Sequence, residues 1–256
     1  MTPSELTFPM TTKLFLANAE TFLQRGDIIL SRSPTFTSWL IRFATNSPFS
    51  HAALVYLLPK PEERLNNTFL LESIRAGVGI ANFRGYVEGK SRSQIAIRRL
   101  ERPWANGDFH KHVGGIMLDY VNAGYDLNRA VKMGLSLIFG ARLGWSKFWD
   151  SPNMSMRKTV QRTKRQHRNW IPPQFICGGF IQYGFLQAQL RREGEPAEVI
   201  FRDGLSAHDY DGLLAVSPED IATTEKLTWQ YVIRNGWVHR AESYEAVKRI
   251  ISSAKL

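Results

Sequence analysis

Residues 46–58, NSPFSHAALVYLL, place an ionisable ring where a polar turn gives way to an apolar strand. The segment after His51 is rich in β-forming residues, as a buried strand should be. His51 can be a local cap whose ring is held by a neighbouring carbonyl group. It can also be a catalytic base, which requires a nucleophile and an orienting group from elsewhere in the chain.

The composition favours a folded chain. Its 256 residues are 43% hydrophobic and 12% aromatic, enough for a sizeable core. We expect a single domain over residues 1–256, with an N-terminal helical extension over 1–25 and a basic insertion over 141–170. The N-terminus lacks the pattern of a secretory signal, and no window resembles a membrane span. The expected location is therefore the cytoplasm, with possible peripheral attachment to a membrane.

Hydrophobic periodicity and turn residues predict an α+β fold. The strands group in the centre of the chain, with helices before and after them. Predicted helices cover residues 12–25, 35–45 and 109–123, the segment after Cys177 with its apolar positions Phe180, Ile181, Phe185 and Leu186, and the tail from Tyr244. Predicted strands are IIL after Gly26-Asp27, residues 51–58 and 68–74, GVGIANF, QIAIRRL and a short strand at LLAV before a helix start at Ser217.

Cys177 is the one cysteine, which excludes an internal disulfide and a zinc site of cysteines alone. The prolines of IPPQFI, which leads into Cys177, exclude a helix there, so the thiol lies at or within a residue of the next helix start. The partial positive charge of a helix N-terminus lowers a thiol pKa. Gly178 and Gly179 follow, either to let a substrate carbonyl approach backbone N–H groups or only to allow tight packing.

Glu72 is the carboxylate embedded in the apolar run FLLESI. If residues 51–58 and 68–74 pair as antiparallel strands, the start of the first lies near the end of the second, which brings His51 close to Glu72. Glu72 could then orient the imidazole ring. The alternative is a solvated glutamate on a strand edge.

Several short motifs follow one another in the order typical of a known family. They are Gly26-Asp27, the turn TNSPFSH over residues 45–51, Glu72, Gly124-Tyr125-Asp126, Phe175-Ile176-Cys177 and Ser217-Pro218-Glu219-Asp220. The set resembles NlpC-type papain-like enzymes. Because the histidine precedes the cysteine, it resembles their circularly permuted branch, the YiiX-like amidases. The resemblance covers roughly residues 24–225.

The resemblance implies a permuted papain-like fold, with a small antiparallel sheet or half-barrel packed against helices. It implies that Cys177 is the nucleophile, His51 the general base and then acid, and Glu72 the group that holds the imidazole. Tyr125 would line the site or help to bind the oxyanion; alternatively it is a core aromatic residue. The family usually has serine after the cysteine, whereas this chain has Gly178, which bears on substrate positioning.

Residues 141–170 carry +7 of the net charge of +10, with Asp150 as the one acidic residue. Aromatic residues lie among the basic ones, as at Trp145 and Trp149. This pattern suits an anionic membrane surface, although a solvated face is an equal alternative. Nucleic acid is a weaker candidate because no base-reading motif is present. The basic residues proposed to face an anionic partner are Arg157, Lys158, Arg162, Lys164, Arg165 and Arg168.

No metal or cofactor is expected. Asp108, His110 and His112 stand close together in DFHKH, but alternate residues of a helix point apart, which favours surface histidines. The leading hypothesis is a thiol hydrolase or acyltransferase that acts on an amide, ester or thioester bond of a cell-wall-type peptide or a lipid acyl substrate. The alternative is a catalytically weak or inactive papain-like scaffold that binds an anionic membrane or an acidic polymer.

Overall fold

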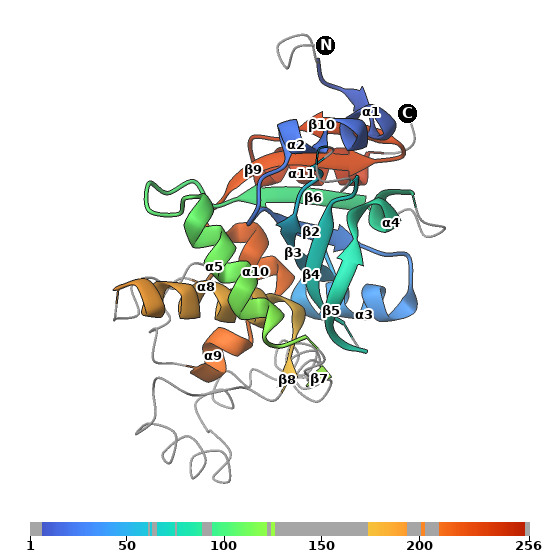
Figure 1. The fold of residues 1–256 in the computed structure, drawn as a ribbon. Coiled ribbons are helices and arrows are strands. Elements are labelled where there is room, and N and C mark those ends of the chain that lie inside the picture. Colours follow the sequence, from blue (N-terminus) through green and yellow to red (C-terminus); the bar gives the residue numbers. More distant parts are fainter. Residues whose placement is uncertain are drawn as a thin grey trace, which may run out of the picture.

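An open antiparallel sheet lies at the centre of the computed structural model, with helices on both faces (Figure 1). The structure describes residues 7–60, 62, 66–74, 76–88, 94–121, 124–125, 174–193, 201–202 and 210–253. The main strands are β1 (Met10–Thr11), β2 (Ile28–Arg32), β3 (His51–Leu57), β4 (Phe69–Ile74), β5 (Gly77–Asn82), β6 (Gln94–Arg99), β9 (Thr228–Arg234) and β10 (Trp237–Arg240). Within the described residues they form an eight-stranded sheet in the order β1-β10-β9-β6-β2-β3-β4-β5.

The described helices are α1 (Thr12–Ala17), α2 (Ala19–Phe22), α3 (Phe36–Thr45), α4 (Phe83–Glu88), α5 (Gly107–Leu118), α8 (Cys177–Glu193), α9 (Tyr210–Leu214), α10 (Pro218–Thr223) and α11 (Tyr244–Ser252). A short parallel pair, β7 (Gly124–Tyr125) and β8 (Gln174–Phe175), forms a second sheet that lies close to β5. The α+β class expected from the sequence is confirmed at this level. The sheet is larger than the small one that was predicted.

Strand β3 is buried on both faces, which explains its continuous apolar run. Ala52 and Leu54 belong to a core that includes Phe180 of α8, whereas Ala53 and Val55 belong to a second core on the opposite face of the sheet. Alternation of side chains along a strand produces this division. His51 begins β3 and therefore lies at the end of the sheet, where groups from both layers can reach it.

The predicted pairing of strands 51–58 and 68–74 is confirmed. β3 and β4 are antiparallel, and Ala53 lies opposite Glu72. His51 is two positions from Ala53, so His51 and Glu72 are diagonal neighbours on one face of the pair. Long side chains can meet at such positions.

The N-terminal segment is integrated into the fold. β1 pairs with β10, and Phe15 and Phe22 are buried in the second core. The predicted helix 12–25 is divided into α1 and α2, because the Asn18 side chain donates a hydrogen bond to the Leu14 carbonyl at 2.8 Å and ends the first helix locally.

Two predictions in the C-terminal part are corrected. The expected strand at LLAV is wrong, because Leu213 and Leu214 lie at the end of α9 and are buried beside α8. The strands β9 and β10 were not predicted, although the turn Asn235-Gly236 has the positive φ angles of a two-residue hairpin. The helix start at Ser217 is confirmed as a reciprocal capping box with Asp220.

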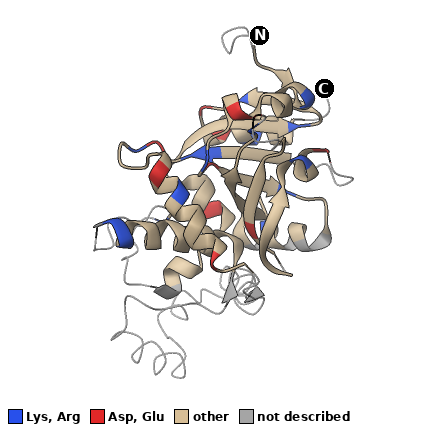
Figure 2. Cartoon of the chain, in the orientation of Figure 1, with Lys and Arg blue, Asp and Glu red and all other residues tan. Residues whose placement is uncertain are grey.

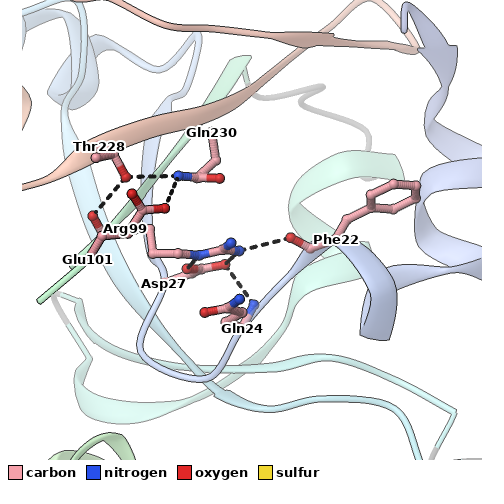
Figure 3. Close-up of polar contacts among 7 residues, drawn as sticks. All are labelled: Phe22, Gln24, Asp27, Arg99, Glu101, Thr228 and Gln230. Atoms are coloured by element: carbon pink, nitrogen blue, oxygen red, sulfur yellow. Dashed lines mark hydrogen bonds and ion pairs between the residues drawn. The ribbon is translucent and has the colours of Figure 1, made fainter. Parts of the chain in front are cut away.

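Gly26-Asp27 has a structural explanation in a buried ion pair at the start of β2 (Figure 3). The Asp27 carboxylate accepts hydrogen bonds from Arg99 Nε at 2.7 Å, from Arg99 Nη2 at 2.8 Å and from the Gln24 N–H at 2.8 Å. Arg99 also donates to the Phe22 carbonyl at 2.9 Å. The pair ties β2 to β6 and to the end of α2.

The expectation of surface histidines is wrong for His110, which is buried on α5. Its ring packs against Gly26, where an added Cβ atom would lie 2.1 Å from His110 Nδ1. Burial lowers the pKa of His110 to about 4, so the ring is neutral at physiological pH. His112, two residues on, is exposed. The predicted helix 109–123 is also shorter than expected and ends at Leu118.

Charged residues of both signs are interspersed over the described helices and loops (Figure 2). The basic segment 141–170 and its six proposed contact residues lie outside the described residues. Among the residues that are described, no helix combines the length and the apolar character needed to cross a bilayer.

Candidate active site

The turn before His51 is held rigidly by serine hydroxyl groups. Ser50 Oγ lies 2.5 Å from Ser38 Oγ of α3 and 3.3 Å from the Ser31 carbonyl of β2. The Ser50 N–H donates to the same carbonyl at 2.9 Å. The polar residues that precede the strand in the sequence therefore fix the backbone that presents the His51 ring.

His51 and Glu72 meet as the sequence predicts. His51 Nε2 lies 2.8 Å from Glu72 Oε2, and the two side chains are 19% and 10% exposed. Burial raises the pKa of Glu72, but the hydrogen bond and charge of His51 and a hydrogen bond from Tyr86 outweigh it, so the net pKa is lowered. Glu72 is therefore an ionised acceptor for the ring.

Cys177 is the first residue of α8, at the position predicted for it. Its thiol is hydrogen-bonded to the His51 ring and also accepts from the backbone N–H groups of Ala52 and Gly178. Because Glu72 occupies Nε2, Nδ1 is the ring nitrogen left for the sulfur. Cys177 is 7% exposed, so the thiol is almost enclosed.

The pKa values of the thiol and the ring move in opposite directions. Burial raises the pKa of Cys177, but the hydrogen bond and charge of His51 and the two backbone N–H groups lower it overall. Burial lowers the pKa of His51, but the hydrogen bonds to Cys177 and Glu72 outweigh it and raise the pKa to about 10. These shifts favour a thiolate–imidazolium pair, the form in which a cysteine is nucleophilic.

Gly178 and Gly179 are explained by packing. A Cβ atom on Gly178 would lie 2.2 Å from the Val216 carbonyl oxygen, and one on Gly179 would lie 2.1 Å from that of Leu214. The backbone that leads into α10 therefore crosses directly over the first turn of α8. Of the two interpretations left open by the sequence, close packing is the one with a direct observation behind it, and it also explains why serine is absent at 178.

Tyr86 is a site residue that the sequence did not indicate. It lies on α4, its hydroxyl donates a hydrogen bond to Glu72 Oε2, and its ring is 6.3 Å from the His51 ring between centroids, at an interplanar angle of 18°. A lone tyrosine in FRGYVE has no local pattern that marks it. Only the fold brings it to the carboxylate.

The remaining predicted residues are placed only in part. Tyr125 lies in β7, whose partner β8 immediately precedes Ile176 and Cys177, so its backbone is close to the thiol helix. The structure describes the backbone of Tyr125 but not its side chain. Among the described residues, no group of three His, Cys, Asp or Glu side chains is placed to hold a metal ion.

Comparison with known proteins gives little beyond this geometry. No protein-family model matches the chain. No curated protein matches it either. Among solved structures, the metalloprotein YiiX from Escherichia coli O157:H7 is similar with a TM-score of 0.46 and 14% sequence identity, over 81% of this chain and 96% of that chain. At this level of similarity, the chemistry has to be inferred from the side chains described above.

Proposed function

We propose that this protein is a cysteine-dependent hydrolase or acyltransferase of the permuted papain-like type, with Cys177, His51 and Glu72 as its triad. One observation carries the proposal: the His51 imidazole bridges the sole thiol of the chain and a buried, ionised carboxylate. A nucleophile, a base in contact with it and a group that orients the base are the parts that covalent acyl transfer requires.

The reaction follows from the proton positions in this pair. The Cys177 thiolate attacks the carbonyl carbon of an amide, ester or thioester, and the electron pair of the C=O bond moves to oxygen. When the tetrahedral intermediate collapses, the imidazolium of His51 gives its proton to the leaving group, which leaves an acyl-enzyme. Water or another acceptor then attacks, with His51 as the base, and the thiolate leaves.

Glu72 and the N-terminus of α8 can stabilise the two charged groups of this reaction, the imidazolium and the oxyanion. Glu72 stabilises the imidazolium through Nε2 and fixes which ring nitrogen faces the sulfur. The first intrahelical bond of α8 runs from the Phe180 N–H to the Ile176 carbonyl, so the N–H groups of Cys177, Gly178 and Gly179 precede it. Such N–H groups, together with the helix dipole, can stabilise an oxyanion, which keeps Gly178 as a proposed oxyanion residue. Tyr125 stays a proposed site residue because its strand pairs with the residues that lead into Cys177.

The substrate class is proposed more broadly: a cell-wall-type peptide amide or a lipid-linked acyl group. The basic and aromatic segment 141–170 favours a substrate at or near an anionic membrane surface. A second candidate function, a binding scaffold without catalysis, rests on the same segment. It predicts binding to anionic vesicles that weakens steeply with salt and is unaffected by Cys177→Ala.

An acyl-type activity probe with a fluorescent tag tests the catalytic proposal. Wild-type protein should be labelled at Cys177, and Cys177→Ala and His51→Ala should each abolish labelling. His112→Ala, which removes an exposed histidine of α5, is the matched control and should label like wild type. Labelling of His51→Ala at the wild-type rate would show that the triad is wrong.

A further inference from the structure

Two donors meet at one oxygen of Glu72. Oε2 accepts the hydroxyl of Tyr86 and faces Nε2 of His51, the ring that contacts the thiol. The terminal torsion of a glutamate is broad and roughly two-fold, so a single hydrogen bond leaves the carboxylate free to rock or to exchange its two oxygens. A second donor on the same oxygen opposes both motions, because either motion would break two bonds at once.

The position of Tyr86 is fixed by the packing of its helix. Its helix, α4, is anchored by Phe83 and Val87, which are buried in the second core. The Phe83 N–H donates to the Thr68 carbonyl at 2.9 Å, next to the start of β4. Tyr86 therefore reaches Glu72 from the layer opposite to α8, which supplies Cys177.

We infer that Tyr86 is a positioning residue whose hydroxyl fixes the Glu72 carboxylate in the orientation that holds the His51 ring against Cys177. The inference rests on the proposed function, since it assigns Tyr86 a role in that triad. Burial and the adjacent Glu72 charge raise the pKa of Tyr86 far above its ordinary value. Its hydroxyl therefore remains a donor over the whole working pH range.

The consequence for the thiol has a definite sign. Without the hydroxyl, Glu72 loses one of the groups that keep it ionised despite burial, and its pKa rises. The carboxylate then holds the imidazolium less firmly, and the imidazolium in turn stabilises the thiolate less. Cys177 should become reactive only at a higher pH than in wild type.

The experiment is the pH dependence of alkylation of Cys177 by iodoacetamide, followed by intact mass. The chain has one cysteine, so the rate reports on this thiol alone. Tyr86→Phe keeps the ring and removes only the hydroxyl. We expect the acid midpoint of the rate profile to rise by about 0.5 pH unit, and turnover of an ester substrate to fall about 10-fold.

Tyr244→Phe is the matched control. Tyr244 also donates to a glutamate, with its hydroxyl 2.8 Å from Glu219 Oε2, and neither residue is among the hydrogen-bond partners of Cys177, His51 and Glu72 described above. It should lose a similar hydrogen bond and leave the thiol profile unchanged. In a Glu72→Gln background, Tyr86→Phe should have no further effect on the midpoint, because the group through which it acts is gone.

Three outcomes overturn the inference: an unchanged midpoint in Tyr86→Phe, a midpoint that falls, or an equal shift in Glu72→Gln and wild-type backgrounds. A fall would mean that the hydroxyl competes with His51 for the carboxylate instead of orienting it. Failure of the proposed function is recognised separately, because wild-type Cys177 would then titrate like a free thiol and His51→Ala would not alter its profile.

Discussion

Two ion pairs in this protein have similar lengths and different roles. Asp27–Arg99 joins an acid to an arginine that is always charged, and Asp27 is fully buried with both of its oxygens bonded. His51–Glu72 joins an acid to a ring that changes its charge, and the second nitrogen of that ring faces a thiol. The first pair fixes strands together. The second pair can transfer a proton, because the His51 ring titrates and can exchange its proton with the Cys177 thiol.

The largest expected effect lies in the titrating pair. His51→Gln keeps a donor for Glu72 but removes the base, so turnover of an activated ester should fall by about 10³-fold or more. The loss in the free energy of unfolding, measured by urea denaturation, should be smaller than that of a variant that breaks Asp27–Arg99, because the new amide still donates to Glu72 and Tyr86 still does so too. A variant that keeps its turnover, or that loses stability instead, would remove the distinction between the two pairs.

Arg99→Met breaks the other pair and leaves Asp27 buried without its cation. We expect a loss of about 3–5 kcal/mol in the free energy of unfolding. Burial already raises the pKa of Asp27, and removing Arg99 raises it further, so the variant should recover stability as the pH falls and Asp27 takes up a proton. Lys248→Ala removes an exposed pair with Glu245 and should cost less than about 0.5 kcal/mol. Equal losses in the two variants would contradict this account.

Gly179→Ala tests whether shape, in addition to charge, seats the thiol helix. The added methyl group would overlap the Leu214 carbonyl, so we expect a loss of about 2 kcal/mol in the free energy of unfolding. Gly115→Ala, at an open position of α5, should instead stabilise the protein by about 0.5 kcal/mol or more. Thermal unfolding of both variants gives the comparison, and a stable Gly179→Ala protein would show that the crossing backbone yields easily.

The smallest expected effect concerns the pH dependence of turnover in the wild-type protein. Cys177 is a thiolate above its lowered pKa, and His51 is protonated below its pKa of about 10, so the reactive pair exists between the two values. Ester turnover should therefore be bell-shaped, with an acid limb below the pKa of a free thiol and an alkaline limb near pH 10. An acid limb at the position of a free thiol would indicate that the ring does not stabilise the thiolate.

The arrangement of Cys177, His51 and Glu72 could be predicted where the deciding signals are local. The prolines before Cys177 fix the helix start, and strand pairing across one polar turn brings His51 to Glu72. These are short-range constraints on backbone conformation and register.

Contacts between distant segments leave no such signal. Arg99 follows Asp27 by 72 positions in the sequence. Tyr86 reaches Glu72 only because α4 packs on the face of the sheet that carries the second core. The apolar run at Leu213-Leu214 suits a strand and a buried helix end equally well, and packing on α8 decided between them. The prediction of His110 as a surface residue was wrong for the same reason. The positions of residues in the sequence do not show that its ring packs against Gly26.

The pairing of β1 with β10 has a practical consequence for how the protein is handled. Within the part of the chain that the structure describes, Met10 and Thr11 are the strand residues that pair with the outer edge of β10, and the Thr12 N–H adds one further bond to the Gly236 carbonyl. A shortened variant lacking this segment would leave the backbone groups of β10 open to a second molecule, next to the half-exposed ring of Trp237. Aggregation of such a truncated protein would therefore reflect an unpaired strand at the edge of the sheet and not a failure of the rest of the chain to fold.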